Sequence, residues 1–208
     1  MGRASQARSA ATRTQRLIDL SRSVAIVEGI VLYPDAIGDA GERFAALRGE
    51  LDVRQEHLRF FGRDVAMPRL TAWYGDAGAT YTYSGLRNEP APWTSTLRRL
   101  RDDLNEALSL ELNSCLANWY RNGEDSMGWH ADNERELRDA IVSVSFGATR
   151  SFQLREGRKG APITLPLEHG SVLVMTVSSQ RHYAHRLPKQ RQAGTRINLT
   201  FRTVERSV

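Results

Sequence analysis

The chain has 208 residues, which suits one domain, and 40% of them are hydrophobic, enough to form a real core. Its net charge is +5 and its pI about 9.8, a modest excess that favours a polyanionic partner such as nucleic acid. Its single cysteine, Cys115, excludes an intramolecular disulfide and a cysteine-rich zinc site. No apolar run approaches the roughly 18 residues that span a bilayer, so we expect no membrane association and a cytoplasmic protein, nucleoid-associated if bacterial, with nucleus or organelle as alternatives.

The first segment, residues 1–22, holds five arginines among Ala, Ser and Thr, with Asp19 as its only acid. It has almost no apolar pattern, so we predict a mobile basic arm that contacts phosphates. An organellar transit peptide has a similar composition and is the alternative. Over residues 23–208 we predict a single domain, because no internal repeat or second domain is visible.

Two helices are predicted in the N-terminal half. After a short apolar run at 24–31, Asp35 can cap a helix that ends near Leu51. The clearer helix follows Pro92, with Thr94 or Ser95 as its cap. Leucines at 97, 100, 104 and 108 repeat at helical spacing while charged residues face away, which indicates a helix packed on a core.

After residue 112 the hydrophobic period shortens from 3.6 to 2, which is typical of strands. Short strands separated by glycine-containing turns fill the remainder of the chain. With the helices collected in the N-terminal half, this pattern predicts a mainly β fold with helices (α+β), a sandwich or jelly roll with an N-terminal helical buttress. The predicted strands are 114–120, 141–146, 151–155, 162–167, 171–177 and 196–204.

His130 and Asp132 stand two positions apart in a segment with little hydrophobic periodicity. In an extended chain both side chains point to one face, roughly 7 Å apart at the backbone, close enough to share an ion. Such a pair alone is more often a surface loop than a metal site. A third ligand must come from elsewhere, and His182 and His185 lie just beyond a predicted strand. Two imidazoles and one carboxylate form the ligand set of Fe(II) sites that activate oxygen.

The last predicted strand places Arg196, Asn198, Thr200 and Arg202 on one face, with a core-like opposite face. The two arginines either form a solvent-exposed rim or point inward, where they need buried anions. A dicarboxylic acid such as 2-oxoglutarate supplies two carboxylates, each able to accept a forked pair of hydrogen bonds from one guanidinium.

With these residues the chain resembles the AlkB family of Fe(II)- and 2-oxoglutarate-dependent dioxygenases, nucleic acid dealkylases with a double-stranded β-helix (jelly-roll) core. The resemblance runs from about Phe60 to Val204, and it places the jelly-roll core at 113–204. It rests on four short motifs in the family's order. They are "NWY" at 118–120, "WHADNE" at 129–134, "HRLP" at 185–188 and "RINLTFR" at 196–202.

The resemblance implies a ligand set for iron and a binding site for 2-oxoglutarate, with dioxygen as the third reactant. The implied iron ligands are His130, Asp132 and His185; His185 is preferred to His182 because it precedes the Leu-Pro pair. His182 is then expected beside the ligands. The implied 2-oxoglutarate residues are Asn118, Tyr120 and Arg196 at the far carboxylate and Asn198, Thr200 and Arg202 at the iron-chelating end.

A second block, residues 60–90, resembles the nucleotide-recognition region of the duplex-acting AlkB homologues. Phe61 occupies the position of the aromatic finger that enters the base stack, with Gly62 and Arg63 beside it. An enzyme that acts on a base inside a duplex must extrude that base and fill the gap. Simple core aromatics are the alternative reading of this block.

The same block is implied to hold the extruded base. Tyr81 and Tyr83 would line the base pocket, with Tyr83 stacking on the base, and Arg69 would lie near the substrate. Asn133 and Glu134 are expected to face the base. Asn133 stands where the duplex-acting relatives usually carry an acid, and an amide cannot balance a cationic methylated base, so the preferred lesion stays open.

The implied function is direct-reversal DNA repair: oxidative demethylation of N-alkylated bases such as 1-methyladenine and 3-methylcytosine, with etheno adducts as further candidates. The reaction would release formaldehyde and succinate. The alternatives are an RNA or tRNA demethylase, another 2-oxoglutarate-dependent hydroxylase, and a non-enzymatic basic jelly-roll binding module. We expect a monomer that acts on DNA. The loop with Lys189 and Arg191 has few basic residues, which leaves duplex or single-strand preference open.

Overall fold

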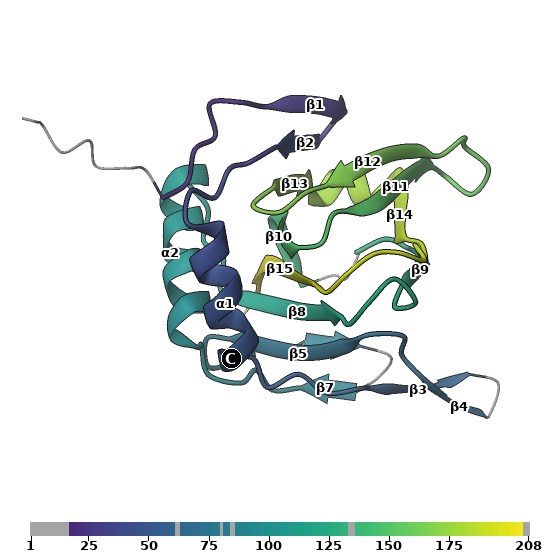
Figure 1. Ribbon diagram of the computed structural model, residues 1–208, viewed down its shortest axis with the longest axis horizontal. Helices are drawn as coiled ribbons and strands as arrows, with labels where there is room; N and C mark the ends of the chain where they lie inside the picture. Colours follow the sequence, from purple (N-terminus) through teal and green to yellow (C-terminus); the bar gives the residue numbers. More distant parts are fainter. Residues whose placement is uncertain (1–16, 61–62, 80, 84–85, 133–135, 206–208) are drawn as a thin grey trace, which may run out of the picture.

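Two antiparallel sheets form the centre of the protein (Figure 1), whose computed structural model describes residues 17–60, 63–79, 81–83, 86–132 and 136–205. The seven-stranded major sheet has the order β1-β2-β13-β10-β15-β8-β5, and the four-stranded minor sheet has the order β12-β11-β14-β9. The major-sheet strands are β1 (Val24–Val27), β2 (Ile30–Tyr33), β13 (Val172–Thr176), β10 (Leu137–Gly147), β15 (Arg196–Val204), β8 (Ser114–Tyr120) and β5 (Leu70–Gly75). The minor-sheet strands are β12 (Ile163–Leu167), β11 (Arg150–Glu156), β14 (Tyr183–Leu187) and β9 (Met127–His130).

Strand register aligns residues that lie far apart in the sequence. In the major sheet, β15 pairs with β8 so that Arg196 lies opposite Tyr120 and Asn198 opposite Asn118. In the minor sheet, β14 pairs with β9 so that His185 lies opposite His130. Directly opposite residues point to the same side of a sheet, so the pairing alone brings these side chains together.

Two helices form the predicted buttress, α1 (Ala40–Glu50) and α2 (Ser95–Leu108). Thr94 caps α2, because its side chain accepts a hydrogen bond from the backbone N–H of Leu97 (3.3 Å). In Figure 1 the helices stand together along one side of the sheets. The leucines of α2 pack with buried residues of β8, β10 and β15, which makes the first of two hydrophobic clusters.

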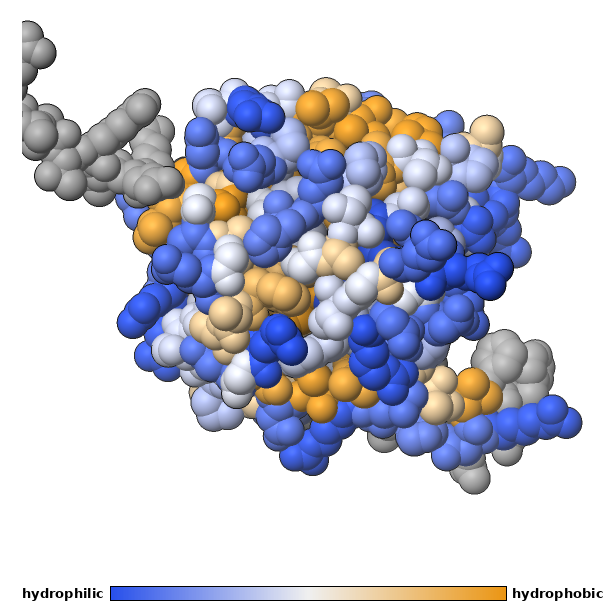
Figure 2. Space-filling view, viewed as in Figure 1, coloured by the Kyte–Doolittle hydropathy of each residue, from blue (hydrophilic) through white to orange (hydrophobic). Residues whose placement is uncertain are grey.

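The second hydrophobic cluster joins the two sheets. It contains Ile141 and Leu173 of the major sheet together with Leu154 and Leu165 of the minor sheet. Hydrophilic residues cover much of the face in Figure 2, and hydrophobic ones gather at its upper edge, where Figure 1 places β1, β2 and β12. The apolar side chains between the sheets fix the major and minor sheets relative to each other, and the two sheets form the walls of any site that lies between them.

Two small hairpins complete the described fold: β3 (His57–Phe60) with β4 (Arg63–Ala66), and β6 (Tyr81–Tyr83) with β7 (Leu86–Asn88). The β3–β4 pair extends away from the sheets at the lower right of Figure 1. A short 3-10 helix, η1 (Val177–Arg181), follows β13. None of the described helices is long and apolar enough to span a membrane.

The predicted mainly β fold with a helical buttress is confirmed, with three corrections. The first helix starts at Ala40, after Asp39, and not at Asp35, whose positive φ of 51° belongs to a turn. The described part of the N-terminal half also contains seven strands, β1 to β7, which were not predicted. Two strands after residue 112, β9 and β14, were not predicted.

Candidate metal centre and adjoining pocket

A pocket lies between the two sheets. Its walls come from β8, β10, β13 and β15 on the major sheet and from all four strands of the minor sheet. Nine residues singled out in the sequence line it together. They are Asn118, Tyr120, His130, Asp132, His185, Arg196, Asn198, Thr200 and Arg202.

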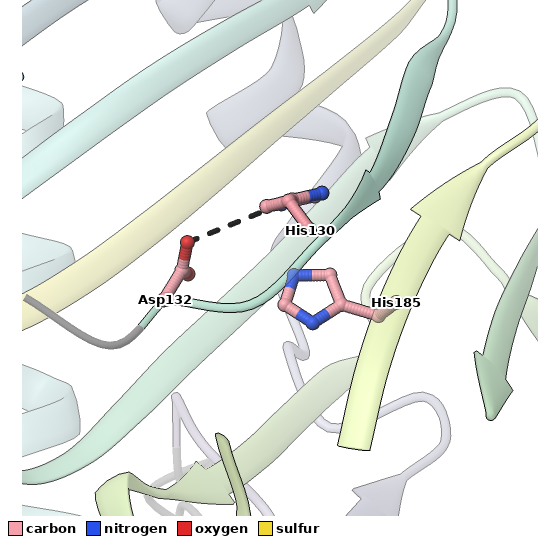
Figure 3. A group of neighbouring side chains, drawn as sticks. All are labelled: His130, Asp132 and His185. Atoms are coloured by element: carbon pink, nitrogen blue, oxygen red, sulfur yellow. Dashed lines mark ion pairs between the residues drawn. The ribbon is translucent and has the colours of Figure 1, made fainter. Parts of the chain in front are cut away.

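His130, Asp132 and His185 form a compact group in this pocket. One potential ligand atom from each lies within 4.8 Å of the others, and the two imidazole centroids are 4.1 Å apart. Figure 3 shows His130 arriving on β9 and His185 on β14, with Asp132 on the segment that leaves β9. Nε2 of His130 lies 3.9 Å from Oδ1 of Asp132, so the three side chains converge on a space of the size that one metal ion needs.

The hydrogen bond of His130 fixes which nitrogen faces the group. Nδ1 lies 2.8 Å from the carbonyl oxygen of Gly128, and a carbonyl can only accept, so Nδ1 carries the proton. Nε2 then presents its lone pair toward Asp132. Metal-binding histidines commonly donate their second N–H to a carbonyl in this manner.

The electrostatic environment keeps these three side chains in the protonation states that can bind a metal ion. Burial opposes ionisation of Asp132, but Arg202 and the two histidines outweigh it and lower the pKa of the carboxyl to about 2. Burial and the neighbouring His130 lower the pKa of His185 to about 3, and burial also lowers the pKa of His130. At neutral pH the group is therefore one carboxylate and two neutral imidazoles, the protonation state that binds a metal.

Arg202 holds the carboxylate in place. Its Nη2 donates to Oδ2 of Asp132 over 2.8 Å, and both side chains are nearly inaccessible. Asp132 is also held through its backbone N–H, which donates to Oε1 of Gln180 (3.1 Å). One carboxylate oxygen is thus engaged by Arg202 while the other faces the histidines.

Arg196 occupies the far end of the pocket beside Tyr120. Its Nη2 donates to Oγ of Ser145 (3.0 Å), whereas its Nε and Nη1 are buried without a hydrogen-bond partner among the described residues. Burial lowers the pKa of its guanidinium to about 10. A buried cation with two unused donors is costly unless an anion accepts from it, so this end of the pocket suits a carboxylate.

Asn118, Asn198 and Thr200 line the wall between the two ends. Asn198 donates through Nδ2 to Oγ of Ser143 (2.8 Å), and Thr200 donates to Oδ1 of Asn198 (3.2 Å). Oδ1 of Asn118 accepts from Nε of Arg69 (2.8 Å), and Arg69 is buried. Arg69 therefore reaches the pocket through Asn118.

The other predicted substrate residues are only partly described. Arg63 is exposed at the start of β4, and the backbones of Tyr81 and Tyr83 lie in β6. Their side chains, and all of Phe61, Gly62, Asn133 and Glu134, lie outside the described part of the protein. The arm predicted at 1–22 lies mostly outside it as well, since the description starts at residue 17.

His182, which was expected beside the ligands, does not line the pocket. His182 ends η1 with an exposed side chain, while Gln180 of the same short helix contacts Asp132. Phe152, which stacks on His185 with centroids 5.3 Å apart, was also missed as a site residue. Inward alternation in β11 could have indicated Phe152, but no local signal marks Gln180.

Comparison with known proteins adds to this geometry. Residues 29–202 match the family model of the 2OG-Fe(II) oxygenase superfamily. The chain belongs to this superfamily. It is 39% identical over 180 residues to human DNA oxidative demethylase ALKBH2, covering 80% of this chain and 69% of that protein. It is 43% identical over 203 residues to human alpha-ketoglutarate-dependent dioxygenase alkB homolog 3, covering 89% and 70%.

These relatives place the protein in the AlkB branch of the superfamily, as the sequence motifs indicated. A solved structure, OsALKBH1, superposes with a TM-score of 0.62 at 17% identity, over 88% of this chain and all of that one, which supports the jelly-roll fold. The chain spans about two thirds of the length of the mammalian ALKBH2 relatives, between 65% and 69%. The protein is an Fe(II)/2-oxoglutarate-dependent dioxygenase, and the interpretation as a non-enzymatic module is set aside.

The residues present fit the reactants of this superfamily: Fe(II), 2-oxoglutarate and dioxygen. The His130–Asp132–His185 group offers two nitrogens and one carboxylate oxygen, the donor set typical of Fe(II) oxygenases. The unused donors of Arg196 fit the free carboxylate of a dicarboxylic acid. Both fits rest on atoms of this chain and not on its relatives alone.

Proposed function

We propose that the protein demethylates N-alkylated bases in DNA by oxidation, with 1-methyladenine and 3-methylcytosine as first substrates. The observation that carries the proposal is the His130–Asp132–His185 group, with Asp132 and His185 buried and His130 half-buried, beside an arginine with unused donors, in a chain similar to a DNA oxidative demethylase. When bound, Fe(II), 2-oxoglutarate and dioxygen supply the oxidation, which releases succinate, carbon dioxide and, from the methyl group, formaldehyde.

In this proposal His130, Asp132 and His185 hold the iron. Nδ1–H of His130 is anchored on Gly128, and Oδ2 of Asp132 is anchored on Arg202, so two of the three ligands are fixed before metal binds. Rigid ligands control which iron positions stay open to the reactants.

The cosubstrate would lie along β15. Arg196 and Tyr120 take the far carboxylate, with Asn118 beside them, because Arg196 has unused donors and faces Tyr120 across the register. Arg202, with Asn198 and Thr200, lines the end nearest the iron ligands. A buried bidentate clamp of this kind positions its ligand and excludes water.

For the nucleic acid we propose the roles that the family resemblance implies. Phe61, between β3 and β4, would fill the gap left by an extruded base, with Gly62 and Arg63 beside it. The projection of the β3–β4 hairpin from the sheets in Figure 1 supports such a reach. Tyr81, Tyr83, Asn133 and Glu134 would contact the base, and Arg69 would act close by through Asn118.

A formaldehyde-release assay over methylated and etheno bases in single-stranded DNA, duplex DNA and RNA tests the proposal. We expect release from methylated DNA; turnover confined to RNA would favour the RNA demethylase alternative. We expect Phe61→Ala to lower activity on duplex more than on single strands, and equal losses would remove the finger role. Glu106→Ala, which alters an exposed residue of α2 on the helical buttress, is the surface control.

We also propose that the protein acts as a monomer through a single catalytic domain spanning 23–208. The residues proposed to hold iron and 2-oxoglutarate line one pocket of a single chain, so neither set needs a residue from a second copy. Sedimentation equilibrium during turnover conditions checks this: a dimer that loses activity on dilution would contradict it.

A further inference from the structure

Arg150, the first residue of β11, is the most deeply buried charged side chain outside the predicted machinery among the residues that the structure describes. Its exposed fraction is 0%, and no described carboxylate makes an ion pair with it. Its donors reach three backbone carbonyls: Asn122 (3.2 Å), Asp125 (2.8 Å) and Pro188 (2.7 Å). A buried guanidinium is costly, so this placement calls for an explanation.

The three carbonyls belong to the segments that connect site residues. Asn122 and Asp125 lie between β8, which ends at Tyr120, and β9, which ends at His130. Pro188 follows β14, which carries His185. One guanidinium therefore ties together the ends of three strands that carry a predicted cosubstrate residue and two predicted iron ligands.

The junction around Arg150 is closely packed. The backbone N–H of Gln190 donates to the carbonyl of Gly123 (2.8 Å), and the N–H of Ser151 donates to Oε1 of Gln190 (3.1 Å). A Cβ built on Gly123 would lie 1.8 Å from the carbonyl oxygen of Gln190. The loops have no room to move apart or together without breaking these contacts.

Arg150 also faces the ring of Tyr120. Its Cζ lies 5.7 Å from the ring centroid, and Cζ of Arg196 lies 5.9 Å from the same centroid. Tyr120 is thus flanked by two buried guanidiniums. Both Nη atoms of Arg150 donate to carbonyls and its Nε has no partner among the described residues, whereas in Arg196 both Nε and Nη1 lack one. The positive charge of Arg150 adds to the potential that an incoming carboxylate meets.

We propose that Arg150 is a positioning residue for 2-oxoglutarate: it fixes Tyr120 and the ends of β8, β9 and β14, and so shapes the pocket end at which Arg196 takes the far carboxylate. It contacts no reactant itself. The inference rests on the cosubstrate part of the proposed function and is independent of which nucleic acid is the substrate.

The test is the affinity of Arg150→Met and Arg150→Lys for 2-oxoglutarate, measured by calorimetry on anaerobic Fe(II)-loaded protein without nucleic acid. We expect Arg150→Met to weaken binding about tenfold, which equals about 1.4 kcal/mol, and Arg150→Lys to recover part of it because the charge remains. In steady state, KM for 2-oxoglutarate should rise while KM for the oligonucleotide stays within about twofold.

Arg43→Met is the matched control. Arg43 is also a buried arginine, but it joins α1 to α2 through Asp39 and Asp103, away from the pocket. A loss of 2-oxoglutarate affinity in Arg150→Met no larger than in Arg43→Met would overturn the proposal, because general destabilisation would then explain it. Because affinity is measured without DNA, an absence of DNA demethylation would not affect this result.

If neither Arg150 variant folds, Gly123→Ala tests the same junction from the opposing loop. It forces Gly123 and Gln190 apart and replaces no residue that is predicted to contact a reactant. Weaker binding of 2-oxoglutarate with retained Fe(II) affinity supports a positioning junction. Unchanged binding in Gly123→Ala would refute it.

Discussion

Replacing Arg196 by methionine separates the effect of this residue on the stability of the protein from its effect on the affinity for 2-oxoglutarate. Arg196 is 2% exposed, and of its three guanidine nitrogens only Nη2 has a partner among the described residues. Burial holds its pKa at about 10 in place of its ordinary value above 12, which corresponds to roughly 3 kcal/mol against the charged form. The folded protein without cosubstrate therefore carries a destabilising cation.

Methionine has a similar length, needs no hydrogen bonds and fills irregular space. After allowing about 1 kcal/mol for the lost bond to Ser145, we expect the unfolding free energy of metal-free Arg196→Met to rise by about 2 kcal/mol. Its affinity for 2-oxoglutarate should fall about 100-fold, since charge-assisted hydrogen bonds contribute roughly 1.5–3 kcal/mol each and Arg196 has two unused donors.

Urea unfolding in a chelator gives the first quantity, and calorimetric titration of 2-oxoglutarate into the anaerobic Fe(II) protein gives the second. Arg43→Met should behave in the opposite way, losing stability while keeping affinity, because Asp39 and Asp103 lose their partner. An Arg196→Met protein that is less stable than the parent and binds 2-oxoglutarate equally well would refute the reasoning.

Three further outcomes follow from the same structure. The pKa of His185 is lowered to about 3 in the folded protein, so below about pH 6.5 the unfolded chain binds a proton that the folded protein does not. The unfolding free energy of the metal-free protein should therefore fall by about 2 kcal/mol between pH 6.5 and 5. In urea titrations His185→Gln should flatten this pH dependence, while His57→Gln, at an exposed site, should not. Thr94→Ala should lower the unfolding free energy by about 1 kcal/mol through the lost N-cap, and unchanged thermal melting would argue against the cap. Gly147→Ala should cost more than Thr94→Ala, because φ is +87° and a Cβ would lie 2.4 Å from the carbonyl oxygen of Thr195; equal melting temperatures for the two variants would contradict this.

Strands with one polar face and one apolar face could be predicted from the sequence. The segments 114–120 and 196–204 match β8 and β15, because their residues alternate between the pocket and the helix-packed cluster. The alternation also placed Arg196 and Arg202 on one face. Whether this face of β15 points inward or toward solvent could not be predicted from the sequence, because it depends on whether the minor sheet covers that side.

The strands that carry the ligands were harder to predict. β9 and β14 are four and five residues long, and their inward positions hold His130 and His185 where a hydrophobic pattern would need apolar residues. Functional side chains thus replace the signal on which strand prediction depends. Arg150 was missed because its partners are backbone carbonyls, which leave no trace in the pattern of side chains.

The decisive assay is the yield of formaldehyde and succinate from an oligonucleotide containing 1-methyladenine, with Fe(II), 2-oxoglutarate and oxygen, for the parent protein and His130→Ala. We expect the parent to restore adenine and to release one formaldehyde for each methyl group removed, and His130→Ala, with an unchanged far-UV spectrum, to release none. Formaldehyde release by His130→Ala at the parent rate would contradict the assignment of the site, and a parent that makes succinate but never restores the base would contradict the proposed substrate.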